Sequence, residues 1–191
     1  KFLIELFIKL SRILNFEFEF KLVGDISESL KEKFIKKSKL LNTKGNLVFQ
    51  NFEYDNLAKN IIGSTIGISP RKPYEADICS SPSKVVEYMS LGIPVVANRE
   101  IPDQYHAIKD SKAGVSTSYS STNFAKAIHF LLNRPKMISK MSHNGRVWVK
   151  TNRNYINENV TIPSDTNGLS TGPVQINTGS TVTVNGEWVI V

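Results

Sequence analysis

The 191-residue sequence lacks the features that mark several special classes of protein. It has one cysteine, Cys79, which excludes an internal disulfide framework and a cysteine-rich zinc site. Its three histidines do not have the spacing of metal ligands. No apolar run approaches the roughly 18 residues that span a bilayer, because the most apolar stretch, residues 2–14, carries Glu5, Lys9 and Arg12. We therefore expect a folded, cytoplasmic chain that holds no metal.

Basic residues are missing from the last part of the chain. The net charge is +7, yet neither Lys nor Arg follows Tyr155, so residues 1–155 carry +10 and residues 156–191 carry −3. This change in composition predicts two domains, 1–155 and 156–191. The chain also begins with Lys1, in the middle of a helical pattern and without a signal peptide. We expect that an N-terminal part is missing.

The apolar pattern of residues 1–151 alternates between helix and strand. It predicts helices at 2–14, 28–41, 55–62, 82–91, 101–109, 121–133 and 135–151, and strands at 16–23, 46–50, 65–69, 94–98 and 114–117, with a loop from 70 through Cys79. Short apolar strands separated by helices indicate an α/β fold, a parallel sheet with helices on both faces. Ligands of such sheets bind beyond the carboxyl ends of the strands, which here are residues 24–25, 50–51, 69–82 and 98–99.

Beyond Tyr155 the pattern changes to short strands and polar turns. We predict strands at 159–163, 172–176, 181–184 and 188–191, with a hairpin turn at Asn185-Gly186. About 35 residues bury little core alone. This β-rich appendage should therefore pack on the main domain, on copies of itself, or on another partner.

The segment from Ser80 to Ala97 has the residues of an anion-binding helix start. Ser81 is placed to cap the helix and Pro82 to be its first residue. The next amides, of Ser83 and Lys84, then lack partners within the helix and lie at its positive end. This arrangement is typical of a diphosphate site.

Glu87 follows one turn later, three residues after Lys84 and four after Ser83, so the three share a helix face. A carboxylate there would repel a phosphate, but it can accept two hydrogen bonds from a vicinal diol such as a ribose. Gly92 then ends the helix and Pro94 opens a buried strand. The spacing of Ser83, Lys84 and Glu87 therefore fits a nucleotide, with the diphosphate at the first turn of the helix and the ribose at Glu87.

The run from Pro82 to Ala97, PSKxxEYMxxGxPVVA, resembles a signature of the retaining GT-B glycosyltransferases. That family, the group 1 or family 4-like glycosyltransferases, includes sucrose synthases and bacterial mannosyl- and glucosyltransferases. The resemblance extends through the 22–25 turn, the 46–52 strand and the 113–115 strand, and covers about residues 1–150.

This resemblance implies the C-terminal, donor-binding, Rossmann-like half of a hexosyltransferase. Such a half would bind a UDP- or GDP-linked sugar as donor substrate, with no other cofactor, for transfer to an unidentified glycan or lipid. Glu87 would hold the ribose hydroxyls, and Ser83 and Lys84 the diphosphate, largely through backbone amides. Gly24 would let the backbone approach the phosphates closely.

Pro70 and Arg71 would line the entrance to that site. In many family members a first glutamate stands eight residues before the one that matches Glu87, and this chain has Cys79 there, with Glu75 and Asp77 nearby. The catalytic residues would lie largely in the missing N-terminal half. The family generally needs no metal, and the chain alone should bind nucleotide weakly and transfer nothing efficiently.

Plainer interpretations stay open beside these. Pro82 can simply begin an ordinary helix whose Glu87 lies in solvent. Arg71, Lys72 and Tyr74 can belong to an ordinary surface loop. A basic run in the second helix comprises Lys31, Lys33, Lys36, Lys37 and Lys39. It fits a solvated face or contact with the inner face of a membrane, and it favours nucleic acid less because no aromatic residues are interleaved.

The β-rich appendage resembles the segments that end some phage tail-fibre and surface proteins, which implies self-association or attachment. A second hypothesis for the whole chain is therefore a non-catalytic structural or attachment protein that uses a degenerate glycosyltransferase domain as its scaffold.

Overall fold

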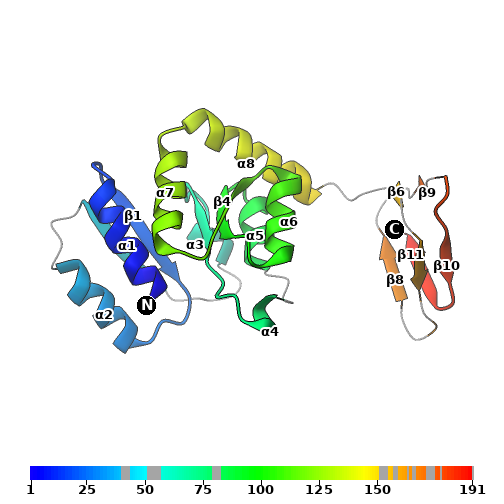
Figure 1. The fold of residues 1–191 in the computed structure, drawn as a ribbon, viewed down its shortest axis with the longest axis horizontal. Helices are drawn as coiled ribbons and strands as arrows, with labels where there is room; N and C mark the ends of the chain where they lie inside the picture. The colour runs from blue at the N-terminus through cyan, green and yellow to red at the C-terminus, as the bar shows by residue number, and fades with distance from the viewer. Residues whose placement is uncertain are drawn as a thin grey trace. The chain divides into compact units, whose positions relative to one another are not determined.

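The structure is a computed structural model that divides into two compact units, unit 1 (Lys1–Val149) and unit 2 (Lys150–Val191). It describes residues 1–39, 44–50, 57–78, 83–150, 155–156, 159–162, 164, 167–170, 175–176 and 178–190. Figure 1 shows helices and strands alternating along the first of these units, and strands alone in the second. No helix in the described ranges is long and apolar enough to cross a membrane.

The elements of unit 1 follow the predicted alternation. Its helices are α1 (Phe2–Ile13), α2 (Glu28–Lys39), α3 (Leu57–Ile61), α4 (Glu75–Ile78), α5 (Ser83–Ser90), α6 (Pro102–Ser111), α7 (Ser121–Leu132) and α8 (Pro135–Lys150). Its strands are β1 (Phe18–Val23), β2 (Gly45–Gln50), β3 (Gly67–Ser69), β4 (Val95–Asn98) and β5 (Gly114–Thr117). The predicted α/β architecture is confirmed.

Helix α4 is a correction to the predicted 70–79 loop. The amide of Ile78 donates to the carbonyl of Tyr74 at 2.9 Å, which closes one helical turn. Pro73 lies two residues before Glu75, the first residue of α4, so its missing N–H removes no hydrogen bond of the helix. The loop after β3 is therefore partly helical.

The strands of unit 1 pair in parallel, in two sheets. In the first, β1 pairs with β2 from Phe18 opposite Gly45 to Val23 opposite Gln50. In the second, β4 lies between β3 and β5. Within the described residues no ladder joins β1 to β3. The carboxyl ends of β3, β4 and β5 lie together because the strands run in the same direction.

Strand β4 is buried on both faces and separates two groups of core side chains. Val96 belongs to the larger group, with Phe7 of α1 and Phe124 of α7. Val95 and Ala97 belong to the other group, which α5 and α6 cover. Successive strand side chains point to opposite faces, so β4 forms the middle layer between the α1/α7 side and the α5/α6 side (Figure 1).

Unit 2 consists of short strands that pair in parallel at long range. They are β6 (Tyr155–Ile156), β7 (Val160–Ile162), β8 (Asn167–Ser170), β9 (Gln175–Ile176), β10 (Val182–Val184) and β11 (Glu187–Ile190). Strand β6 pairs with β9, β7 with β10, and β8 with β11. The predicted β character is present, and β6 and β8 were not predicted.

The predicted Asn185-Gly186 hairpin is wrong. Strands β10 and β11 flank this dipeptide but do not pair with each other. The amide of Asn185 instead donates to the carbonyl of Ile162, at 2.9 Å, at the end of β7. Because each strand bonds to an earlier strand, the dipeptide forms a corner between two strand pairs.

Candidate functional site

Helix α5 is seated by an apolar face on the β3–β4–β5 ladder. Val85 and Met89 are buried in the second core group. The Tyr88 ring packs on the backbone of β3 at Gly67, where an added Cβ would lie 2.6 Å from the ring. Gly67 therefore permits a close approach that any larger residue would prevent. This packing leaves Ser83 exposed to solvent at the first turn of α5.

The carboxyl end of α5 is set by Gly92, as the sequence predicts. Its φ of 73° lies in the left-handed region that favours glycine. The amide of Gly92 donates to Met89 O at 3.0 Å, and that of Ile93 to Tyr88 O at 2.9 Å. These bonds are typical of a glycine-terminated helix that turns directly into the next strand.

A groove of about 460 Å³ lies beside α5. Lys84 and Glu87 line it from α5, and its other walls include residues 16–21 and Val23, along the length of β1, and residues 63–68, which lead into β3. Lys84 is exposed and Glu87 is half-buried. The predicted shared face of these two side chains is thus turned towards an open cavity, with a cation and a carboxylate one helical turn apart.

The surroundings of Glu87 leave its carboxylate available. Within the described part of the chain it takes part in no ion pair and no side-chain hydrogen bond. The pKa of the neighbouring Tyr88 is raised, first by burial and then by the negative charge of Glu87. The carboxylate is therefore free to accept hydrogen bonds from a molecule in the groove.

Gly24 follows β1 directly, next to the groove-lining Val23. Its φ of 148° suits glycine, and nothing lies within 4 Å of where a Cβ would be. The backbone is fixed by the Gly24 amide, which donates to Gln50 O at 3.1 Å. An incoming ligand can therefore approach the Gly24 backbone without meeting a side chain of that residue.

Pro70 and Arg71 begin the loop after β3. The Arg71 amide donates to Asn98 Oδ1 at 2.8 Å, which ties this loop to the end of β4. Further along, the Lys72 ammonium lies 4.0 Å from the Tyr74 ring centroid. Tyr74 is 54% exposed, which fits the ordinary surface loop of the plainer interpretation as well as a ligand role.

Asn98 is the centre of a buried polar network that sequence reasoning only partly found. Asn98, Gln104 and Ser69 are all buried. Gln104 Nε2 donates to Asn98 O at 2.8 Å and to Asn98 Oδ1 at 3.2 Å, and Ser69 Oγ donates to Gln104 Oε1 at 3.1 Å. The network holds the carboxyl ends of β3 and β4 together. Spacing from Ile101 and Ile108, both buried, could have placed Gln104 on the inner face of α6.

Glu100 extends this network to the chain after β5. Its carboxylate accepts from Asn98 Nδ2 at 3.1 Å and from the Tyr119 amide at 3.0 Å. Burial acts to raise the pKa of Glu100, but these hydrogen bonds and the nearby Arg99 outweigh it, so the pKa lies below its ordinary value. Glu100 is therefore a structural anion that fixes the rim next to Arg71. Nothing in the local sequence distinguished it from a solvated acid.

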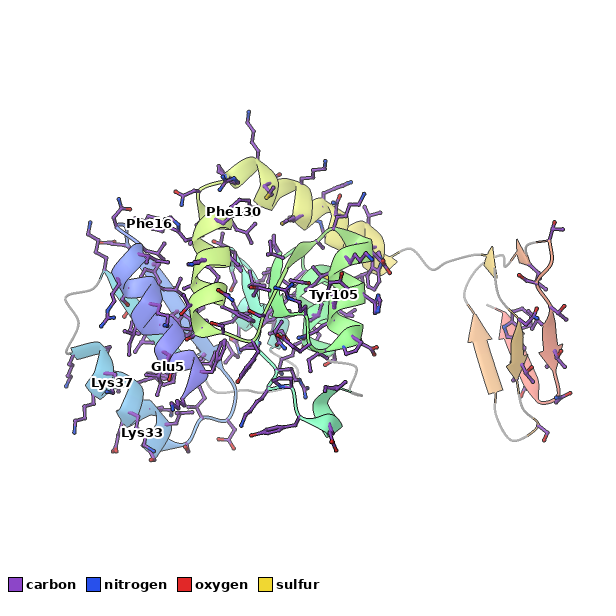
Figure 2. All side chains as sticks on the ribbon, in the orientation of Figure 1. Glu5, Phe16, Lys33, Lys37, Tyr105 and Phe130 are labelled. Atoms are coloured by element: carbon purple, nitrogen blue, oxygen red, sulfur yellow. The ribbon has the colours of Figure 1, made fainter. Side chains whose placement is uncertain are left out.

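Other predicted features lie elsewhere or outside the described residues. Cys79, Ser81 and Pro82 are outside them. Among the residues described, no three His, Cys, Asp or Glu side chains gather as metal ligands would. Figure 2 shows Lys33 and Lys37 on α2, at the edge of unit 1; the predicted membrane contact of this basic helix stays a prediction.

A second hollow, of about 570 Å³, lies at the amino ends of β1 and β2, among Glu17, Glu19 and Lys44. Ligands of parallel sheets bind at the opposite, carboxyl ends. The groove beside α5 shares Glu17, Phe18 and Glu19 with this hollow, but it also reaches Val23, at the carboxyl end of β1, and the predicted pair Lys84 and Glu87, which makes it the better candidate.

A family model described as glycosyl transferases group 1 matches residues 1–148. The chain belongs to this family. The family-level resemblance seen in the signature from Pro82 to Ala97 is therefore confirmed, and the groove beside α5 lies within the matched group 1 region.

Two crystal structures of Anabaena HepE are similar in fold to this group 1 chain. The complex with UDP-glucose superposes with a TM-score of 0.60 at 15% identity, and the complex with UDP with a TM-score of 0.58 at 16% identity. Each match covers 76% of this chain and 39% of HepE, so the present chain spans well under half of that protein. A search of curated proteins found no significant match.

Proposed function

We propose that unit 1 is the donor-binding half of a retaining GT-B glycosyltransferase, a hexosyltransferase that uses a UDP- or GDP-linked sugar. The observation that carries this proposal is the placement of Lys84 and Glu87 on one groove, beside the exposed first turn of α5. Family membership and the HepE complexes with UDP and UDP-glucose support the choice of ligand class.

The two ends of a nucleoside diphosphate have opposite requirements, and the groove offers both. A diphosphate is stabilised by a cation and by unpaired amides at the positive end of a helix. In our proposal Lys84, together with the amides of the first turn at Ser83, binds that group and offsets the charge that develops on it when the glycosidic bond breaks. Gly24 allows the phosphates to lie close to the backbone.

The ribose is neutral and donates hydrogen bonds. The Glu87 carboxylate accepts from both ribose hydroxyls in the proposed complex, one turn away from the phosphates. We further propose that Pro70 and Arg71 line the entrance for the sugar; they are not among the residues that line the groove itself, and the Arg71 amide is held by Asn98 Oδ1. In this proposal the other half of a GT-B enzyme binds the acceptor, a glycan or lipid, and supplies most of the catalytic residues.

Isothermal titration of the 191-residue chain tests each half of the proposal separately. UDP, GDP, uridine and pyrophosphate are the four ligands. We expect Glu87→Ala to weaken UDP or GDP binding by about 1–3 kcal/mol, the cost of leaving polar partners unpaired, while pyrophosphate binding is unchanged. Lys84→Gln should weaken pyrophosphate and leave uridine unchanged.

Glu32→Gln is the matched control, since Glu32 is an exposed acid on α2 outside the residues that line the groove. Equal nucleotide affinity in wild type and Glu87→Ala would remove the ribose role. If neither UDP nor GDP binds at millimolar concentration, the donor-binding proposal is overturned and the scaffold hypothesis is favoured.

A further inference from the structure

The strand pairing in unit 2 has a regular long-range order. Every pair joins one strand to the third strand after it: β6 with β9, β7 with β10, and β8 with β11. The partners lie 20 residues apart in the pairs that begin Tyr155–Gln175 and Asn167–Glu187, and 22 apart in the pair that begins Val160–Val182. This connectivity is that of two stacked coils of a β-solenoid, each coil with three strands.

We call strands β6–β8 coil 1 and strands β9–β11 coil 2. Each strand has one neighbouring strand in the part of unit 2 that the structure describes, so each coil keeps one unpaired edge there. Solenoids generally need at least three repeats to be stable, and uncapped end repeats leave backbone donors and acceptors open. The two coils of the described residues are fewer than the three that a stable stack generally needs.

The direction of the amides in β10 identifies the open edge of coil 2. The amide of Thr181 donates to Asn159 Oδ1 at 2.9 Å, and that of Asn185 to Ile162 O at 2.9 Å, so both point towards coil 1. Amides alternate in direction along a strand. The amides of Val182 and Val184 therefore point away from coil 1, along the outer edge of coil 2.

This edge lacks the devices that natural proteins use to prevent strand-to-strand association. Such edges usually carry lysine, proline or inward-facing charges. The strands of unit 2 contain neither lysine nor proline, and their one charged residue is Glu187. Coil 2 also exposes apolar side chains, with Ile176 45% and Val184 43% accessible. The edge is thus suited to pairing.

We propose that two copies of this chain associate by stacking coil 2 on coil 2. Coil 1 follows unit 1 directly in the chain, at Lys150, whereas coil 2 is separated from unit 1 in sequence by coil 1. Contact between the same surfaces of two copies closes as a twofold dimer and does not extend further. A dimer of the 191 residues contains four coils, which exceeds this minimum of three.

Sedimentation velocity of the 191-residue chain over a concentration series tests this. The chain has a mass of 21.4 kDa, and we expect a reversible monomer–dimer equilibrium. Val184→Pro removes an outward amide but no bond to coil 1, because proline is tolerated at strand edges whose N–H faces outward. It should weaken dimerisation by about tenfold or more, since each dimer loses the bond twice.

Val184→Lys is the second variant, and it adds a charge to the edge without changing the backbone. It should also weaken dimerisation, and far-ultraviolet circular dichroism should show that both variants keep their strands. Ile62→Lys is the matched control, because Ile62 is an apolar side chain of unit 1 with 61% exposure. It should dimerise as the wild type does.

The proposal is overturned if the wild-type chain stays monomeric at about 100 µM, a concentration that such experiments can reach. Dimers that persist unchanged in both Val184 variants place the interface elsewhere and overturn it too. Trimers or open-ended assemblies contradict the coil 2 to coil 2 arrangement.

Discussion

Units 1 and 2 both pair their strands in parallel, but they connect and cover them differently. In unit 1 a helix follows each of β1, β2, β3 and β4 before the next strand, and helices cover β4 on both faces. In unit 2 the connections contain no helix within the described residues, and a strand reaches its partner after 20 or 22 residues. Unit 1 should therefore depend on large buried side chains, and unit 2 on backbone pairing between coils.

The two tryptophans allow this comparison to be tested, because each unit contains one. Trp148 lies in α8 and Trp188 in β11. Fluorescence in the single-tryptophan backgrounds Trp188→Phe and Trp148→Phe then reports the urea unfolding of each unit separately.

The largest expected effect is that of Phe7→Ala in unit 1. Phe7 is fully buried, with its ring centroid 5.7 Å from that of Phe20 and 6.1 Å from that of Phe18. Removing it leaves a cavity, and the free energy of unfolding reported by Trp148 should fall by about 3–5 kcal/mol. The Trp188 transition should not move; an equal shift in both would show that the units unfold together.

A smaller loss is expected from Asn98→Ala. Without this side chain the Arg71 amide loses its acceptor and Glu100 loses a donor. The Trp148 transition should fall by about 1–3 kcal/mol. Lys126→Ala is the control, because Lys126 is an exposed side chain of α7 outside this network. Equal losses of unfolding free energy in the two variants would show that the buried network stabilises unit 1 no more than an exposed side chain does.

Glycines in left-handed conformations offer a matched pair across the two units. Gly92 has a φ of 73° and Gly179 a φ of 88°. Alanine at either position should cost about 1–2 kcal/mol of backbone strain, and at Gly92 it must also displace the Arg146 guanidinium. Gly92→Ala should shift the Trp148 transition alone, and Gly179→Ala the Trp188 transition alone. A shift of the Trp188 transition by Gly92→Ala, or of the Trp148 transition by Gly179→Ala, would contradict independent unfolding of the two units.

The smallest effect is a pH dependence carried by Glu100. Its pKa is lowered in the folded state, so its charged form stabilises unit 1 above the ordinary value of 4.5. This contribution is lost as the pH falls from 4.5 through the lowered folded value. Urea unfolding of wild type and Glu100→Gln should therefore differ more at pH 6 than at about pH 3. A difference that does not change with pH would exclude this role.

Much of unit 1 could be predicted because its patterns are local. The Ser83–Ser90 helix, Gly92 and the buried strand after Pro94 follow from residues within one another's reach along the chain. The groove could not be predicted in the same way, since Val23 and Ile68 reach it from strands far from Glu87 in sequence. Spacing placed Lys84 and Glu87 on one face, but only the fold supplies the opposite wall.

In unit 2 a strong local signal gave the wrong pairing. Asn185-Gly186 favours a hairpin on its own, but the residues that pair with Val182–Val184 are Val160–Ile162. The sequence did hold a hint, because Val-Thr-Ile at 160–162 is repeated as Val-Thr-Val at 182–184. A search for internal similarity at this period detects such a fold where turn chemistry does not.

The spacing of about 20 residues in unit 2 bears on how its gene can change. An in-frame tandem duplication of one such segment adds a whole rung of about 4.8 Å, and every new strand meets a neighbour of the kind it already has. Length in this region can therefore grow or shrink stepwise by recombination, while unit 1, whose helices and strands share common cores, has no equivalent segment to copy.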